Sequence, residues 1–255
     1  MKQDARSLPP PAKLAEGIGA SFHTVDGLFR ISAVTVFDAF RHAVRREKCD
    51  RRIAWWAKSV VEGTPIDLRV RGRERLDGGA TFLLMSNHQS HYDIPVLFNA
   101  ISGSIRMVTK AELFRLPIFG PALREAGFIE IDRSNRHKAI ESLNRAREAL
   151  RAGTHVWIAP EGTRSRTGEL LPFKKGGFML AIDAGLPILP VGIAGTHAVL
   201  PPDAVLTSRG QRVGVVIGEP IRPEGKTRAG LMVETRHAIA ALVAEAEALR
   251  ADAAR

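Results

Sequence analysis

Short apolar runs of strand length recur along this chain, and they constrain its fold more than any other feature. Residues 81–85, 128–131 and 156–158 are three of them. Segments with a helical spacing of apolar residues, such as 136–152, separate these runs. Strands that alternate with helices predict an α/β fold, with a mixed, largely parallel central sheet that is flanked by helices.

Polar residues follow each of these three runs directly. The clusters lie at 88–93, at Asp132 and Arg133, and at 161–164. In open α/β sheets, ligands collect beyond the carboxyl ends of the strands. We therefore expect the three clusters to meet in one cleft.

The first cluster contains His88 and, five positions later, Asp93. A neutral imidazole is well suited to accept a proton near pH 7, and a neighbouring carboxylate can orient the ring and stabilise its charged form. His88 also forms a His-x2-His pair with His91, but no further ligand follows at a metal-site spacing, so we expect no metal. Ser90 is expected to cap the next helix and not to act as a nucleophile.

The chain is strongly basic, with a formal net charge of +10, which implies an anionic partner. Residues 41–73 hold ten Lys and Arg against four Asp and Glu, so most of the excess lies there. A nucleic acid is not the expected partner, because no nucleic-acid-binding motif is recognised. The single cysteine, Cys49, excludes an internal disulfide.

The N-terminal quarter is expected to associate with a membrane. Residues 1–24 carry three consecutive prolines and no secretory signal pattern, and they are predicted to form a poorly ordered tail. Residues 25–63 are predicted to form two amphipathic helices, the second beginning at Asp50, that lie flat on an anionic bilayer. The alternative is an ordinary helix pair packed on the domain of residues 64–255. Neither helix offers a clean span, so the expected location is peripheral, on the cytoplasmic face of the membrane.

Residues 87–93 resemble the His-x4-Asp motif of the glycerolipid acyltransferases, in particular of the 1-acylglycerol-3-phosphate O-acyltransferase type. Three further blocks of that family occur in the same order, at 127–133, 160–165 and 189–191. The resemblance covers roughly residues 50–220. Ala159 departs from it, since the family often has Phe at that position.

The resemblance implies transfer of a fatty acyl group from acyl-CoA or acyl carrier protein to the hydroxyl of 1-acylglycerol-3-phosphate, which forms phosphatidate. His88 is then the base and Asp93 its orienting acid, backbone N–H groups around Gly162 are candidate oxyanion donors, and Pro190 shapes the acyl pocket. No cofactor is implied besides the donor substrate. The residues that the resemblance assigns to substrate binding are Lys110, Arg133, Glu161, Gly162, Thr163 and Arg164.

Two other functions stay open at this stage. The acceptor could be another lyso-lipid, such as an amino-acid lipid or a glycolipid, because the motifs define the reaction better than the head group. A non-catalytic, basic membrane-binding protein would also account for the charge. Lys174 and Lys175 are possible substrate contacts, with exposed loop lysines as the equally good alternative.

Overall fold

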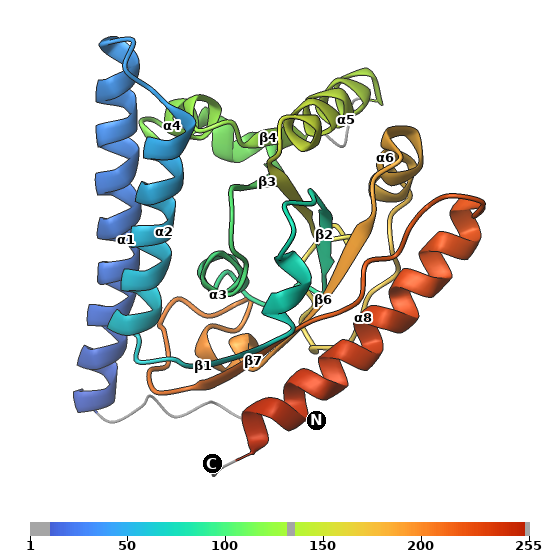
Figure 1. Ribbon diagram of the computed structural model, residues 1–255. Helices are drawn as coiled ribbons and strands as arrows, with labels where there is room; N and C mark the ends of the chain where they lie inside the picture. Colours follow the sequence, from blue (N-terminus) through green and yellow to red (C-terminus); the bar gives the residue numbers. More distant parts are fainter. Residues whose placement is uncertain (1–10, 132–135, 253–255) are drawn as a thin grey trace.

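The computed structural model describes residues 11–131 and 136–252, and these residues form a seven-stranded sheet with helices on both faces (Figure 1). The strand order across the sheet is β1-β7-β6-β2-β5-β3-β4. The strands are β1 (Asp67–Arg71), β2 (Leu83–Ser86), β3 (Ile105–Lys110), β4 (Ile129–Ile131), β5 (His155–Ile158), β6 (Ile188–Ala194) and β7 (Arg212–Ile217).

Strands β6, β2, β5, β3 and β4 run parallel to one another, whereas β7 is antiparallel to β6 and carries β1 parallel to itself. The carboxyl ends of the five parallel strands therefore lie at the same edge of the sheet. The predicted mixed, largely parallel sheet flanked by helices is confirmed.

Helices cover both faces of the sheet. They are α1 (Pro11–Phe40), α2 (Arg46–Gly63), α3 (Asp93–Ala100), α4 (Phe119–Glu125), α5 (Arg136–Arg151), α6 (Gly176–Ala184), α7 (Thr196–Val199) and α8 (Arg228–Ala251), with 3-10 turns η1 (Arg73–Leu76) and η2 (Ala111–Arg115). Helix α3 packs on one face, with the antiparallel pair α1 and α2 outside it, and α8 runs along the opposite side of the molecule (Figure 1).

Two hydrophobic cores fill the spaces between these layers, because successive strand residues point to opposite faces of the sheet. Leu84 and Leu189 belong to the core beneath α2 and α3. Their neighbours Leu83 and Ile188 belong to the core beneath α5, α6 and α8. The segment 184–202, which lacks charged residues, is accordingly the buried strand β6 with its flanking turns.

The first helix differs from its predicted bounds. It begins at Pro11 instead of at residue 25 and ends at Phe40 instead of at 48, so residues 11–24 of the predicted tail are helical. No proline lies between Ala12 and Gly27 to interrupt a helix, and the chain turns at His42, whose φ is 51°.

The second helix also begins earlier than expected, at Arg46. Asp50 does not cap it. Its carboxylate instead accepts hydrogen bonds from Arg106 Nη1 at 2.6 Å and from Ser104 Oγ at 3.0 Å. Asp50 thus lies inside α2 and ties this helix to the end of the sheet where β3 begins.

In helix α1, small residues are buried and large apolar residues are exposed, the reverse of a typical amphipathic helix on a soluble domain. Small residues form its buried face, namely Gly17, Ala20, Gly27, Ser32 and Thr35. Large apolar residues form its exposed face, namely Ile18, Phe22, Val25, Phe29, Val34, Phe37 and Phe40. Phe22 is 69% exposed and Phe40 is 82% exposed.

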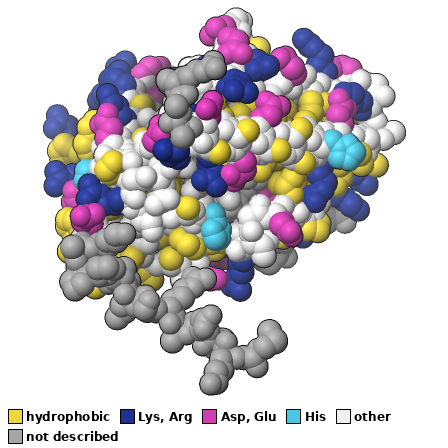
Figure 2. Space-filling model, turned by 90° about the horizontal axis from the view of Figure 1, so that it is seen from below, with side chains coloured by type: hydrophobic (Ala, Val, Ile, Leu, Met, Phe, Trp, Pro, Cys, Tyr) yellow, Lys and Arg dark blue, Asp and Glu magenta, His cyan; other side chains and the backbone are white. Residues whose placement is uncertain are grey.

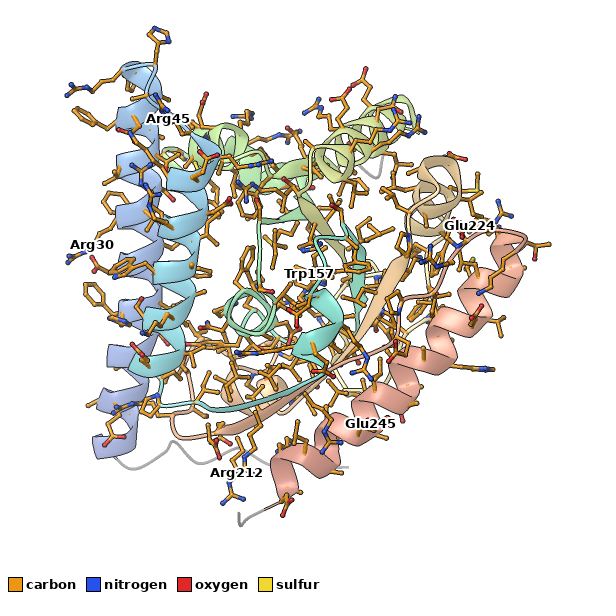
Figure 3. The ribbon with its side chains drawn as sticks, viewed as in Figure 1. Arg30, Arg45, Trp157, Arg212, Glu224 and Glu245 are labelled. Carbon is orange, nitrogen blue, oxygen red and sulfur yellow. The ribbon has the colours of Figure 1, made fainter. Side chains whose placement is uncertain are left out.

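The exposed apolar residues of α1 lie beside basic side chains. In Figure 2, hydrophobic side chains lie among Lys and Arg side chains at the left edge, where α1 runs. Arg30 projects outward from α1 (Figure 3) and pairs with Asp26 at 2.7 Å. Within the described part of the chain, none of the helices combines the length and the apolar character that crossing a bilayer requires.

Candidate active site

The loop after β2 is held in place by two side-chain amides. Asn87 Nδ2 donates to the carbonyl of Ile193 at 2.8 Å, and Asn87 Oδ1 accepts from the N–H of Ile193 at 2.9 Å. Gln89 Nε2 donates to the same carbonyl at 2.9 Å. Asn87 thereby pairs with β6 as a strand backbone would, and it fixes the start of the loop that carries His88.

Asp93 is the first residue of α3, and its side chain is 0% exposed. Its Oδ2 accepts from His88 Nδ1 at 2.7 Å and from the N–H groups of Gln89 and Ser90 at 2.8 and 3.0 Å. Its Oδ1 accepts from Thr196 Oγ1 at 2.5 Å. Four donors and the amino end of a helix therefore stabilise a buried negative charge at this position.

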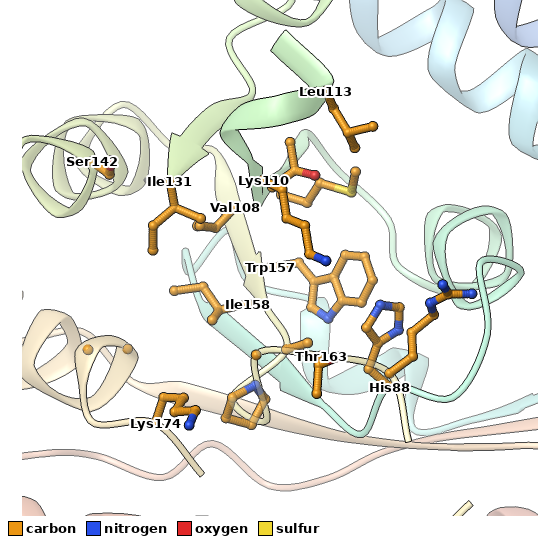
Figure 4. A pocket seen from close by; sticks show the side chains of 18 of the residues that line it. His88, Val108, Lys110, Leu113, Ile131, Ser142, Trp157, Ile158, Thr163 and Lys174 are labelled. Atoms are coloured by element: carbon orange, nitrogen blue, oxygen red, sulfur yellow. The ribbon is translucent and has the colours of Figure 1, made fainter. Parts of the chain in front are cut away.

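His88 connects this carboxylate to an open cavity. Because Asp93 accepts from Nδ1, that nitrogen carries the proton in the neutral ring, and Nε2 keeps a lone pair. The edge of Trp157 packs against the ring, with centroids 5.8 Å apart and planes at 84°. The His88 side chain is 18% exposed, and Figure 4 shows it beside Trp157 at the cavity wall.

The cavity has a volume of about 500 Å³ and brings several of the predicted substrate residues together. Lys110 lies at the end of β3 and points toward Trp157 (Figure 4). Gly162, Thr163 and Arg164 also line it, so the clusters after β2 and β5 share one cleft. The third predicted cluster, Asp132 and Arg133, lies outside the described residues. The remaining wall combines Lys174 and His91 with an apolar group formed by Ile94, Met107, Val108, Leu113, Ile131, Leu143 and Ile158.

Glu161 does not line this cavity, so the structure supports a hydrogen-bonding role for it and not the predicted contact with the substrate. It is 2% exposed, and its Oε1 accepts from the N–H of His88 while its Oε2 accepts from the N–H of Leu171, each at 2.8 Å. Burial raises the pKa of the carboxyl, and the two backbone donors offset part of that shift. Glu161 therefore positions the backbone of the His88 loop.

Three other predictions also need correction or lie outside the described residues. Pro190 is buried within β6, where its carbonyl accepts from the N–H of Gly218, and it is not among the residues that line the cavity. The N–H of Gly162 itself donates to the carbonyl of Ala159 at 3.0 Å, whereas the oxyanion role of its neighbours in the turn stays a prediction. Arg133 lies outside the described residues.

The sequence did not reveal the roles of Thr196 and Trp157. Thr196 follows the end of β6 directly after Gly195, and the only hint was a hydroxyl at the carboxyl end of a further parallel strand. Trp157 is 4% exposed and belongs to the core, and its ring also packs against that of His88. Ser90 does not cap α3, whose N-cap is Tyr92; its hydroxyl instead accepts from the N–H of Tyr92 at 3.1 Å and donates to the carbonyl of Leu200 at 2.7 Å.

Together these features define an α/β protein with a hydrogen-bonded His–Asp pair at the carboxyl edge of its sheet. His88 faces a cavity whose wall combines cationic and apolar side chains. The sequence profile of the acyltransferase family matches residues 67–194, which include the His88 loop, the Gly162 turn and β6. The chain belongs to the acyltransferase family.

Individual relatives agree with this assignment. The chain is 31% identical over 206 residues to a chloroplastic 1-acyl-sn-glycerol-3-phosphate acyltransferase of Arabidopsis thaliana. This alignment covers 80% of this chain and 56% of the relative. It is 36% identical over 166 residues to the 1-acyl-sn-glycerol-3-phosphate acyltransferase of Saccharomyces cerevisiae. That alignment covers 64% of this chain and 54% of the relative. The chain spans about half the length of the curated relatives that it matches.

A solved structure resembles nearly the whole chain. The crystal structure of the 1-acyl-sn-glycerophosphate acyltransferase PlsC from Thermotoga maritima superposes with a TM-score of 0.79 at 26% sequence identity. The match covers 96% of this chain and 98% of that chain. The similarity therefore includes the helix pair α1 and α2 as well as most of the α/β domain.

Replacing Glu161 with Gln is expected to destabilise the fold by about 1–3 kcal/mol, because the amide places an N–H group where an oxygen now accepts from a backbone N–H. The measurement is the free energy of unfolding from urea titration. Glu169→Gln, an exposed change in the same loop, is the matched control and should stay within about 0.5 kcal/mol. Equal stability of the two variants would contradict the positioning role of Glu161.

Proposed function

We propose that this protein transfers a fatty acyl group from a thioester donor to the free hydroxyl of 1-acyl-sn-glycerol-3-phosphate, forming phosphatidate. The observation that carries the proposal is the hydrogen-bonded His88–Asp93 pair, which faces a cavity with both cationic and apolar walls. The names of the relatives and the similarity to PlsC support the choice of acceptor.

The chemistry follows from the free Nε2 of His88. This nitrogen removes the proton from the acceptor hydroxyl as the oxygen attacks the thioester carbonyl, since a hydroxyl is a weak nucleophile until it loses its proton. The imidazolium that forms is stabilised by Asp93. When the C–S bond breaks, His88 returns the proton to the leaving thiolate, so the products are the new ester and a thiol. No covalent acyl-enzyme is required.

Cations on the cavity wall are suited to the phosphate of the acceptor. The planar guanidinium of Arg164 can pair with two phosphate oxygens, and only its Nη1 is held, by the carbonyl of Pro202 at 3.3 Å. Lys110, which also lines the cavity, supplies a second positive charge. Arg133 is the third cation that the family resemblance offers for this role.

The exposed face of α1 supports a peripheral attachment to one leaflet of an anionic membrane. Burying large apolar side chains in hydrocarbon is favourable by roughly 1.5–3 kcal/mol each, and α1 exposes seven of them. Its small buried face allows close packing on α2, as is common for helices in lipid. Trp55, which is exposed on α2, and the basic residues around it are suited to the interface with anionic head groups. The identity of the donor, acyl-CoA or acylated acyl carrier protein, stays a prediction. The location on the cytoplasmic face of the membrane stays a prediction as well.

The catalytic claim is tested with His88→Ala, given lysophosphatidate and acyl-CoA or acyl carrier protein, with products identified by mass spectrometry. We expect kcat to fall on the order of 10²-fold or more, because the general base is lost. His237→Ala, an exposed histidine on α8, is the control and should keep full activity. Full activity of His88→Ala would overturn the mechanism. If the native protein binds vesicles but acylates no lyso-lipid, the non-catalytic alternative is correct.

Attachment to the membrane is tested by replacing Phe22 and Phe29 together with Glu. The change removes two large apolar groups from the exposed face of α1 and adds two negative charges, so we expect at least tenfold weaker binding to phosphatidylglycerol vesicles in a flotation assay. Val233→Glu, on the exposed side of α8, is the control and should bind as the native protein does. Unchanged flotation of the double variant would exclude α1 as the contact surface.

A further inference from the structure

A second cavity lies between the helix pair and the α/β domain. Its volume is about 100 Å³, and its wall is formed by residues of α1, α2, α3, β3 and α4, with Phe128. Ile94, Met107, Phe119 and Ala122 are among them.

The polar groups on this wall bind within the protein. The hydroxyls of Ser32 and Thr35 donate to the carbonyls of Leu28 and Ile31, each at 2.7 Å. Arg52 donates to Asp38 at 2.5 Å and to Thr35 at 3.2 Å. A water molecule needs two to four polar partners to occupy a cavity favourably, whereas this wall offers mainly hydrocarbon. The cavity is therefore suited to an apolar group.

Two residues line both this cavity and the active-site cavity, namely Ile94 and Met107. Ile94 follows Asp93 directly in α3, and Met107 is paired in register with Trp157, which contacts His88. The two cavities thus share part of their wall, at two residues that adjoin Asp93 and Trp157. The second cavity lies on the side of this shared wall that faces α1 and α2.

We infer that the second cavity holds a segment of the acyl chain that the acceptor lipid already carries. This inference rests on the proposed function, because it names the place of one substrate of that reaction. Direct transfer without an acyl-enzyme requires donor and acceptor to be bound at the same time. Two fatty acyl chains must therefore leave the reacting atoms in separate directions.

The position of the cavity identifies which chain it takes. The apolar wall of the active-site cavity continues toward Ile131 and Leu143, on β4 and α5, which lie away from the helix pair (Figures 1 and 4). The second cavity instead adjoins α1, whose outer face is the proposed membrane contact. A lyso-lipid arrives from the membrane, whereas the donor thioester is delivered by a water-soluble carrier, so the cavity beside α1 belongs to the acceptor.

The test fills the cavity with Ala122→Leu, a residue of α4 that lines the second cavity and not the first. The kcat/KM is measured for lysophosphatidates with acyl chains of increasing length and one fixed donor. If the larger side chain displaces about two methylenes of the bound acceptor chain, kcat/KM for long-chain acceptors should fall roughly tenfold. Short-chain acceptors, which do not reach the cavity, should be unaffected. Phe119→Ala, which enlarges the same cavity, should shift the preference toward longer acceptors.

Two comparisons separate this role from a general structural effect. Ala240→Leu, the same substitution on the exposed face of α8, should leave the acceptor profile unchanged. A series of donor chain lengths with one fixed acceptor should give the same profile for Ala122→Leu, Phe119→Ala and the native protein. Thermal denaturation establishes whether each variant is folded. If Ala122→Leu does not fold, the acceptor profile of Phe119→Ala alone tests the inference.

The inference is overturned if the acceptor profiles of both cavity variants match the native profile, if all acceptors lose activity equally, or if the donor profile shifts instead. Failure of the proposed function gives a different result, since the native protein would then form no phosphatidate from any lysophosphatidate.

Discussion

The buried carboxylate of Asp93 is the interaction on which the rest of the site depends. An ionised carboxylate with no exposure to water is costly unless donors surround it. Here the donors come from His88, from two backbone N–H groups of the same loop, and from Thr196 at the end of β6. The cost of burial is thereby offset by bonds that also fix the ring of His88 relative to two different strand ends. Loss of this carboxylate would leave the ring without an orienting partner and the loop without its central acceptor.

The sheet topology makes that arrangement possible. Strand β2 lies between β6 and β5, so the loops that follow these three strands are neighbours at one edge. Asn87 and Gln89 bind Ile193 on one side, and Glu161 holds the N–H of His88 from the other. The helix pair completes the molecule by placing an apolar surface and a small apolar cavity on the side of α3 that is away from the sheet. The His88–Asp93 pair at the strand ends and the exposed apolar face of α1 therefore belong to one fold.

Much of this organisation could be predicted from short stretches of sequence. Alternating strand runs and helices indicated the α/β sheet, and the predicted runs at 81–85, 128–131 and 156–158 correspond to β2, β4 and β5. The pairing of His88 with Asp93 is local, because both lie in one loop and the start of the next helix.

The features that were missed depend on contacts between distant segments. Thr196 reaches Asp93 across 103 positions, and Glu161 reaches His88 across 73, so neither role is visible in a local pattern. Helix α1 was shortened in the prediction because its inner face is built from small and hydroxyl residues, which do not produce the usual apolar stripe. Pro190 was placed at the acyl pocket by resemblance alone, whereas the tertiary structure buries it between neighbouring strands.

The most direct test of this account is the tautomeric state of His88, measured by ¹⁵N NMR on protein labelled at its histidine side chains, with His88→Ala used to assign the signals. The account predicts that, in neutral His88, Nδ1 carries the proton and donates it to Asp93, while Nε2 is unprotonated and able to accept a proton from a hydroxyl. A neutral ring that is protonated at Nε2 and unprotonated at Nδ1 would contradict it.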